Sequence, residues 1–281
     1  MIECFADKDA DIILEYDGIK VLKYDEIKDN GKCYIVSPLV NNGGAEISKL
    51  LFQDGKEFCT DLSLIAKILG ESQSVLEEQW VAFSHKNGFD TYFTNAENTL
   101  DTFWGDNSEF KKLFNKIDKT SIVEFACGRG RHVNKYIGEA TKIILVDVLE
   151  ENIAYCRERF QEETKISYLA NNGKDLKGIP DKSCTSLFSY DAIVHFEMIN
   201  IWEYLMEFNR VLVPGGRALL HHSNNHVNYK VSFTNGESGR NYMSEELFAY
   251  MAYRNGFEVI EQVLIDWGSK DLDCISLIEK K

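Results

Sequence analysis

The residues best suited to chemistry in this 281-residue chain are a glycine-rich turn and an acid that follows it. The turn reads VEFACGRGRHV at 123–133, where small residues at 126, 128 and 130 let the backbone bend sharply and approach a ligand. A helix that begins there offers N–H groups to a phosphate or carboxylate. Asp147 lies 19 residues after Gly128, and a carboxylate at that place can accept both hydroxyls of a ribose. The spacing therefore predicts a site for a nucleoside-containing cofactor.

Histidines supply the candidates for acid–base chemistry. His195 follows an apolar segment, His221 and His222 end the next one, and His226 lies just beyond. A histidine titrates near neutral pH and can take a proton from a hydroxyl. Because side chains alternate along a strand, His221 and His222 should point to opposite faces, one of them toward the pocket. We expect His195 or His222 to be the general base and His221 to contact the substrate. Asp191 could orient His195, touch the cofactor or cap the next helix.

Two further features surround these residues. Asp191, His195, His221 and His222 could assemble a divalent-metal site, although we predict that no metal is bound. The long polar segment 223–243 is predicted to be a loop, and loops of this length often carry function. Its candidates for substrate recognition are Tyr229, Tyr242 and Arg240, the last of which could bind a phosphate through two hydrogen bonds.

The elements that position these residues alternate between strand and helix. Strands are expected at 121–126, 142–148, 166–170, 184–190 and 216–222, and helices at 130–138, 150–163, 198–212 and 244–256. Ser244 and Gly256 are typical N- and C-caps of the last helix. The chain should close with an antiparallel strand pair. This order predicts an α/β fold with a doubly wound parallel sheet, in which ligands bind at the carboxyl ends of the strands.

Several ordered segments resemble the motifs of class I S-adenosylmethionine-dependent methyltransferases. The turn has the form E-x-A-x-G-x-G, beginning at Glu124, where the family typically has E/D-x-G-x-G-x-G. Ala126 is the departure, a small residue in place of the first glycine. Further segments similar to the family's are NNG at 171–173, LFSYDAIVHFE at 187–197, VLVPGGRALLHHSN at 211–224 and LDCISLIEK at 272–280. The resemblance covers roughly 118–281 and implies a Rossmann-like seven-stranded sheet with S-adenosyl-L-methionine as the cofactor.

The resemblance also implies roles in holding the cofactor. Gly128 and Gly130 would admit its methionine portion, Asp147 would hold the ribose, Asn172 would lie at the adenine edge, and Arg131 could meet the carboxylate. Neighbours of these positions are expected to line the same site: Glu124, Ala126, Cys127, Val148, Gly173 and Tyr190. We expect Cys127 to be a small packing residue, because nothing nearby marks it as a reactive thiolate.

The expected reaction is methyl transfer to a hydroxyl of a small polar substrate. The histidine after the fourth strand, the HHSN segment and an N-terminal α/β unit resemble bacterial methyltransferases that act on sugars or other small precursors of surface polysaccharides, including phosphorylated or nucleotide-activated ones. The alternatives are N-methylation of a small amine, such as an amino sugar or a phosphoethanolamine-like group, and a non-catalytic protein that binds S-adenosylmethionine. A dehydrogenase is a further alternative, because dinucleotide enzymes share the glycine turn and the distal acid.

The composition limits the classes of molecule that the protein is expected to bind. The chain has 45 acidic and 31 basic residues, a net charge of −14, which opposes binding to nucleic acid or anionic membranes. No N/D/S-P-P-Y/F segment typical of amino-methylating nucleic-acid enzymes follows the fourth strand, and no run of about 18 apolar residues predicts a membrane span. A small-molecule substrate is the expected partner, and a homodimer is left open.

Location and domains follow from the rest of the sequence. Seven cysteines without CxxC spacing and an acidic N-terminus without an apolar signal segment predict a reduced, cytoplasmic protein. Residues 1–78 are expected to form a small α/β accessory domain without a dinucleotide fingerprint, and 79–281 the methyltransferase domain. Its first part, 79–118, is an aromatic-rich cap that is either simply packed or a lid over the ligand.

Overall fold

The computed structural model describes residues 96–231 and 236–281, Phe93, and five short strands nearer the N-terminus. The chain divides into two compact units, Met1–Ile65 and Ala66–Lys281. The predicted domain boundary at residue 78 lies outside the described residues and stays a prediction. Along the described segments, no helix is long and apolar enough to cross a membrane.

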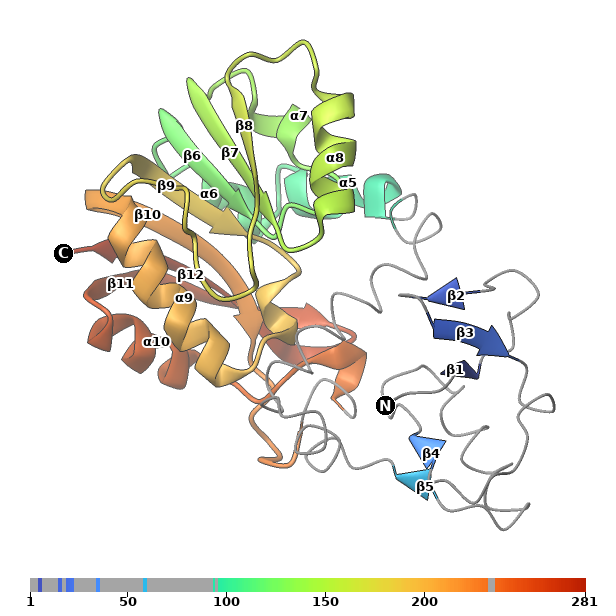
Figure 1. The fold of residues 1–281 in the computed structure, drawn as a ribbon. Helices are drawn as coiled ribbons and strands as arrows, with labels where there is room; N and C mark the ends of the chain where they lie inside the picture. Colours follow the sequence, from blue (N-terminus) through green and yellow to red (C-terminus); the bar gives the residue numbers. More distant parts are fainter. Residues whose placement is uncertain are drawn as a thin grey trace. The chain divides into compact units, whose positions relative to one another are not determined.

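The first unit contains short strands in two groups (Figure 1). In one group β3 pairs in parallel with β1 and antiparallel with β2, and in the other β4 and β5 are parallel. These strands are β1 (Phe5–Ala6), β2 (Glu15–Tyr16), β3 (Ile19–Leu22), β4 (Tyr34–Ile35) and β5 (Phe58–Cys59).

The second unit is built on a seven-stranded sheet in the order β11-β12-β10-β9-β6-β7-β8. Its strands are β6 (Ser121–Phe125), β7 (Lys142–Asp147), β8 (Ile166–Ala170), β9 (Cys184–Ser189), β10 (Leu212–Ser223), β11 (Phe257–Trp267) and β12 (Ser269–Lys280). Pairing is parallel from β8 to β10, whereas β12 runs antiparallel to both of its neighbours. The predicted doubly wound α/β fold and the closing antiparallel pair are confirmed. Because β6 lies between β7 and β9, the chain order reverses at β6, which is where such sheets bind ligands.

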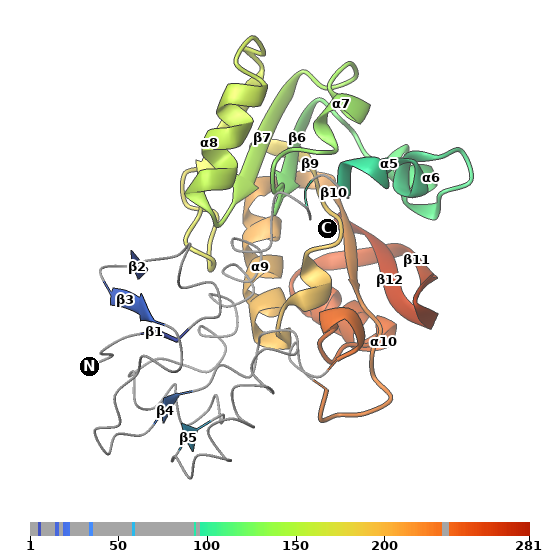
Figure 2. The ribbon, with the colours of Figure 1, turned by 90° about the vertical axis from the view of Figure 1, so that its right-hand side faces the viewer.

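Helices cover both faces of this sheet (Figures 1 and 2). The residues of α9 and α10 bury one face, and those of α5, α6 and α8 bury the other. The helices are α5 (Leu100–Trp104), α6 (Glu109–Phe114), α7 (Val133–Tyr136), α8 (Glu150–Arg159), α9 (Met198–Val211) and α10 (Glu245–Arg254). Two single turns, η2 (Ile193–His195) and η3 (Glu237–Gly239), follow β9 and precede α10.

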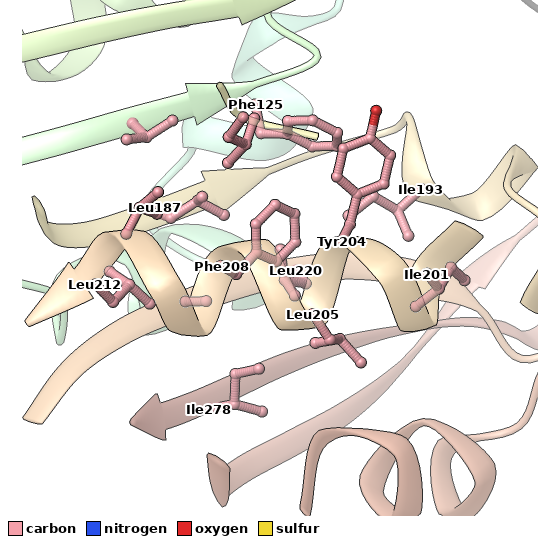
Figure 3. Packing of buried hydrophobic residues seen from close by; sticks show 14 of the residues in the cluster. Phe125, Leu187, Ile193, Ile201, Tyr204, Leu205, Phe208, Leu212, Leu220 and Ile278 are labelled. Atoms are coloured by element: carbon pink, nitrogen blue, oxygen red, sulfur yellow. The ribbon is translucent and has the colours of Figure 1, made fainter. Parts of the chain in front are cut away.

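Strand alternation divides the core between these faces. On β6, Val123 and Phe125 join the cluster under α9, while Ile122 joins the cluster under the N-terminal helices. Figure 3 shows Tyr204 and Phe208 of α9 directed at the sheet beside Phe125, with ring centroids 4.5 and 5.2 Å from that of Phe125. Each such side chain contributes roughly 1.5–3 kcal/mol when fully buried, so this packing fixes α9 against the strands.

The helix ends agree with the sequence in one case and differ in another. Ser244 caps α10 by accepting the N–H of Leu247, as predicted, and Gly256 adopts a left-handed φ of 83°. By contrast, α7 is only one turn long, much shorter than the predicted 130–138. Gly130 has a left-handed φ of 70°, which is incompatible with the predicted helical start at residue 130.

The described part of the predicted cap packs against the sheet. Phe103, Trp104, Phe110 and Phe114 are all buried in the cluster that covers this face. The Trp104 indole donates a hydrogen bond of 3.0 Å to Nδ1 of His132, next to the glycine-rich turn. These four aromatic residues therefore fit the packed-cap interpretation, and the earlier aromatic residues from Trp80 to Tyr92 lie outside the described residues.

Candidate functional site

The glycine-rich turn after β6 has a left-handed backbone at alternate residues. The φ angles are 56° at Ala126, 54° at Gly128 and 70° at Gly130. The turn is closed by two backbone hydrogen bonds of 2.9 Å, from Cys127 N–H to the carbonyl of Val146 and from Gly130 N–H to that of Cys127. Ala126 thus adopts a left-handed conformation that favours glycine. The alanine found there in place of the family's glycine costs about 1–2 kcal/mol of backbone energy.

The two glycines of the turn face different surroundings. A Cβ on Gly130 would lie 2.7 Å from a ring carbon of Phe160 and 3.2 Å from Sγ of Cys156, so this glycine lets α8 pack closely. A Cβ on Gly128 would lie 3.3 Å from the ring of Phe93. Gly130 thus has a packing reason to be glycine, beside its expected role of admitting the cofactor.

Asp147 ends β7 next to this turn. Its Oδ2 accepts the N–H of Gly128 at 2.8 Å, and its Oδ1 accepts from Leu149 N–H at 2.9 Å and from the Asn152 amide at 3.1 Å. The following residue, Val148, is apolar yet 46 % exposed. Asp147, the acid expected to bind the ribose, is therefore anchored to the glycine turn, and the exposed apolar side chain of Val148 lies beside it in sequence.

Glu124 is a buried acid within β6. It accepts the Tyr136 hydroxyl at Oε2, 2.8 Å away, while its Oε1 has no hydrogen-bond partner among the described residues. Burial raises the pKa of Glu124 to about 8, against the lowering effect of the Tyr136 hydrogen bond and of Arg131. Glu124 is therefore a protonated acid at neutral pH, with one acceptor atom unsatisfied beside the glycine turn.

The NNG segment after β8 is a tight turn. The exposed side chain of Asn172 accepts the N–H groups of Lys174 and Asp175 at 2.9 and 3.0 Å, and Gly173 has a φ of 77°. Asn171 N–H donates to the carbonyl of Asp147, which joins this turn to the end of β7. Asn172 thus shapes the turn, and its place at an adenine edge stays a prediction.

Cys127 and Tyr190 are both buried. Burial raises the pKa of each side chain well above its ordinary value, so the thiol and the phenol are neutral. The Tyr190 ring stacks on His221 with centroids 4.4 Å apart and packs on Phe103 at 4.6 Å. Both residues act in packing here, as was expected for Cys127.

Asp191 links two arginines across the end of the sheet. It follows β9 with a left-handed φ of 58°. Its carboxylate lies 3.4 Å from Nη2 of Arg131 in the glycine turn and 3.6 Å from Nη2 of Arg240 in the loop before α10. The side chains of Asp191 and Arg131 are each 13 % exposed. Arg131, expected at the cofactor carboxylate, thus already faces an acid of this chain.

Arg240 was expected to recognise a phosphate, and the structure contradicts this expectation. The residue is only 2 % exposed and binds Asp273 on β12 through Nε at 3.1 Å and Nη2 at 2.7 Å. Its Nη1 donates to the carbonyl of Ser238, and its guanidinium lies 4.9 Å from the ring of Trp267. Because its charge is neutralised by a buried carboxylate, Arg240 is a structural residue rather than a phosphate ligand.

His221 and His222 lie on opposite faces of β10, as alternation predicts, but both are fully buried. His221 accepts the Asp191 N–H at Nδ1, 3.0 Å away, and its Nε2 lies 3.0 Å from Asp273. The Nε2 proton therefore goes to Asp273, and both ring nitrogens are committed. The expected substrate contact by His221 is contradicted by this burial.

His222 was expected as an alternative base, and its surroundings contradict this role. It stacks on Phe248 of α10 with centroids 3.9 Å apart. Its Nδ1 lies 2.8 Å from the carbonyl of Ser223 and its Nε2 2.8 Å from the hydroxyl of Ser276. Burial lowers the pKa of His222 to about 3. A ring enclosed beneath a helix cannot reach a substrate proton.

His195 differs from both. It is half-buried at the end of η2, directly after β9, and its Nδ1 lies 2.9 Å from the carbonyl of Gly239. A carbonyl can only accept, so Nδ1 carries the proton and the lone pair is on Nε2. The carbonyl of His195 also accepts the Asn241 amide at 2.7 Å. His195 is thus held in the tautomer that a general base requires.

The tyrosines proposed for substrate recognition are more exposed. Tyr229 is 79 % exposed and Tyr242 is 36 % exposed. Tyr242 forms a β-bridge with Asn225, which ties the loop to the end of β10. In the part of the chain that the structure describes, no three His, Cys, Asp or Glu side chains gather as a metal site.

Asp273 is the important residue that the sequence analysis missed. It binds His221 and Arg240, and through Arg240 it reaches Asp191. Burial opposes its ionisation, but these hydrogen bonds hold the pKa of Asp273 below its usual range. A signal was present, because Asp273 is the single charged residue in the mostly apolar segment LDCISLI.

The residues at this edge fit the cofactor that the family uses. S-adenosylmethionine carries an ammonium, a sulfonium and a ribose diol. The site offers the carboxylates of Asp147 and Asp191 to match them, and the neutral Glu124 adds a buried carboxyl oxygen, Oε1, that lacks a hydrogen-bond partner among the described residues. The left-handed backbone at Gly128 brings the chain close to a ligand without a side chain in the way.

Comparison with known proteins gives one family match and one curated relative. Residues 123–220 match the sequence pattern of a family described as methyltransferase domain. The ubiquinone biosynthesis O-methyltransferase of Rickettsia conorii is 26 % identical over 117 residues, which are 40 % of this chain and 38 % of that protein. The chain therefore matches well under half the length of this relative.

Solved structures share the fold at low sequence identity. A methyltransferase from Mesorhizobium loti matches 61 % of this chain and 97 % of its own, with 14 % identity and a TM-score of 0.51. One from Methanosarcina mazei matches 60 % and 96 %, with 16 % identity and the same TM-score. The [4+2]-cyclase SpnF matches 60 % and 79 %, with 12 % identity and a TM-score of 0.52, so the likeness shows the fold and not the reaction. The family match and the seven-stranded sheet together place residues 123–220 in a class I, Rossmann-like methyltransferase domain, whose cofactor is S-adenosylmethionine.

Proposed function

We propose that this protein transfers a methyl group from S-adenosylmethionine to a hydroxyl of a small polar substrate, with His195 as the general base. The observation that carries the proposal is the 2.9 Å hydrogen bond between Nδ1 of His195 and the carbonyl of Gly239. It places the basic lone pair on Nε2 of a half-buried ring at the carboxyl end of β9, the strand that pairs with β6.

The surroundings of the other histidines support this assignment. His221 and His222 are fully buried with both ring nitrogens bonded, and His132 is 3 % exposed beneath Trp104. Burial also lowers the pKa of His132 well below its usual value. Among the described histidines, His226 shares the Nδ1–carbonyl contact, 2.8 Å from Asn224, but it is exposed, and His195 alone combines such a contact with a half-buried ring.

The cofactor and the protein have separate tasks in this reaction. When bound, S-adenosylmethionine supplies an electrophilic methyl group on a sulfonium. Asp147 and the glycine turn would hold the cofactor, and Asp191 with Arg131 joins that turn to the segment that bears His195. His195 takes the proton of the substrate hydroxyl at Nε2, a step worth about 10²–10⁴-fold in rate.

The substrate class follows from what remains available. The curated relative is an O-methyltransferase by name, which supports a hydroxyl acceptor. The charge of Arg240 is neutralised by Asp273, so the residue that the sequence suggested for binding a substrate phosphate is already paired within the protein. We therefore propose an uncharged polyol or sugar hydroxyl in place of a phosphorylated one, in a cytoplasmic protein.

The test compares His195→Ala with the unchanged protein in assays of S-adenosylhomocysteine formation on a panel of small alcohols, sugars and amines. We expect a loss of several hundredfold in kcat for His195→Ala with an alcohol acceptor. If His195→Ala methylates an amine at a near-normal rate, the proposal is overturned in favour of N-methylation. Cofactor binding without product on the whole panel would favour a non-catalytic binding protein. Calorimetric titration with S-adenosylhomocysteine and with NAD tests the cofactor directly, and binding of NAD alone would favour a dehydrogenase.

A further inference from the structure

The loop before α10 holds His195 through the two residues on either side of Arg240. Gly239 accepts the Nδ1 proton of His195 at 2.9 Å, and Asn241 donates its amide to the carbonyl of His195 at 2.7 Å. The N–H of Asn241 also donates to the carbonyl of Val194 at 3.2 Å. The position of the His195 ring therefore depends on the position of segment 239–241.

Arg240 attaches this segment to the sheet. Its guanidinium binds Asp273 on β12 through two nitrogens, and its Nη1 donates 3.0 Å to the carbonyl of Ser238 in its own loop. Ser238 and Gly239 both have left-handed φ angles, of 50° and 71°. Such a bend is unfavourable at Ser238, so the guanidinium contact helps to keep the loop in this shape.

Asp273 in turn is fixed by the sheet. Asp273 on β12 is the register partner of Ser223 on β10, and its Oδ2 lies 3.0 Å from Nε2 of His221. His221 accepts the N–H of Asp191 at its other nitrogen. A continuous set of contacts thus runs from β12 to the loop that holds His195 and to the turn after β9.

We propose that the buried Asp273–Arg240 pair is a positioning device for His195, which sets its Nδ1–H tautomer by holding the Gly239 carbonyl against the ring. This inference rests on the proposed role of His195 as the base. Neither residue is catalytic, because both act through the loop. A pair that is 33 residues apart in sequence and enclosed by His221 and Trp267 gives the loop an anchor that solvent does not loosen.

The test removes both charges together, because Arg240 buried without its carboxylate would unfold the protein. The double variant Arg240→Gln/Asp273→Asn is compared with Arg217→Gln/Glu279→Gln. This control pair also anchors a residue to β12: Arg217 of β10 and Glu279 of β12 are register partners with a 2.8 Å Nε–Oε2 contact, at the end of β10 away from His221. Circular dichroism and urea unfolding establish that each variant is folded.

Two readouts separate positioning from folding. The first is the ring ¹⁵N spectrum of His195, assigned by its loss in His195→Gln, which reports which nitrogen bears the proton. The second is kcat and KM for both substrates. We expect the first double variant to lose the pure Nδ1–H tautomer and to lose about 10²-fold in kcat, with KM for the cofactor within about twofold. The control should change neither readout.

The outcomes distinguish this inference from the function on which it rests. An unchanged His195 spectrum in the folded double variant overturns the positioning role, whatever the kinetics show. A changed spectrum with unchanged kcat supports the positioning role and overturns His195 as the base. Arg240→Lys serves if the double variant does not fold, because it keeps the charge but loses the forked contact. We expect a mixed tautomer there, and a pure Nδ1–H form would contradict the inference.

Discussion

The Cα of Gly130 packs so closely on Phe160 that a Cβ there would lie 2.7 Å from the ring, and the φ of Gly130 is 70°. The glycine turn is therefore pressed against α8 as well as presented to a ligand. Any side chain at this position must move Phe160 or Cys156, both of which are buried in the same cluster.

Gly130→Ala should lower the free energy of unfolding by about 2–5 kcal/mol, since a left-handed alanine costs about 1–2 kcal/mol and overpacking adds about 1–3 kcal/mol. Urea unfolding measures this loss. Gly138→Ala is the matched control, because a Cβ on Gly138 meets no atom within 4 Å. The control should change stability by less than about 0.5 kcal/mol. Equal effects of the two substitutions would refute the packing role of Gly130.

Ala126→Gly should stabilise the protein. The φ of Ala126 is 56°, which costs alanine about 1–2 kcal/mol, whereas glycine adopts it freely but loses about 0.5–1 kcal/mol in backbone entropy. The net gain in the free energy of unfolding should reach up to about 1.5 kcal/mol. Thermal and urea unfolding test it, and a clear loss of stability would show that the methyl group of Ala126 contributes more by packing than its backbone costs.

Glu124 should make the protein less stable as the pH rises. Burial raises its pKa to about 8, whereas the unfolded chain has the ordinary value of 4.5. Between these values the folded state keeps the proton and the unfolded state releases it, so rising pH favours unfolding, by about 3–5 kcal/mol in all. Glu124→Gln removes this term and should flatten the decline between pH 5 and pH 8 in urea unfolding. Parallel curves for both proteins would contradict the raised pKa.

His222 should act in the opposite sense at acid pH. Burial lowers its pKa to about 3 from 6.5, so between these values only the unfolded state binds the proton. Stability should therefore fall as the pH falls below 6.5, by about 1.4 kcal/mol per pH unit from this residue. In His222→Gln the slope between pH 6 and pH 4.5 should be shallower by that amount. The kcat of the folded variant should stay within a few-fold, and a loss like that of His195→Ala would restore His222 as a base.

Much of the fold could be predicted because its signals are local. The apolar runs that became β6 to β9 follow from composition over five or six residues, and Ser244 identifies the start of α10 through a cap within one turn of the chain. The glycine turn and Asp147 were placed correctly at neighbouring strand ends, where they share the hydrogen bond between Gly128 N–H and Oδ2. The family match covers residues 123–220, which lie within the predicted methyltransferase domain.

The sequence by itself thus determined the strands, their order along the chain and the residues at their carboxyl ends. Only the tertiary structure decided which histidine is accessible and which arginine is neutralised. His222 and Arg240 look available in sequence. In the structure α10 covers His222, and Arg240 is paired with Asp273, which lies 33 residues away on β12. Burial and charge pairing depend on partners brought together by packing, and no local pattern encodes those partners.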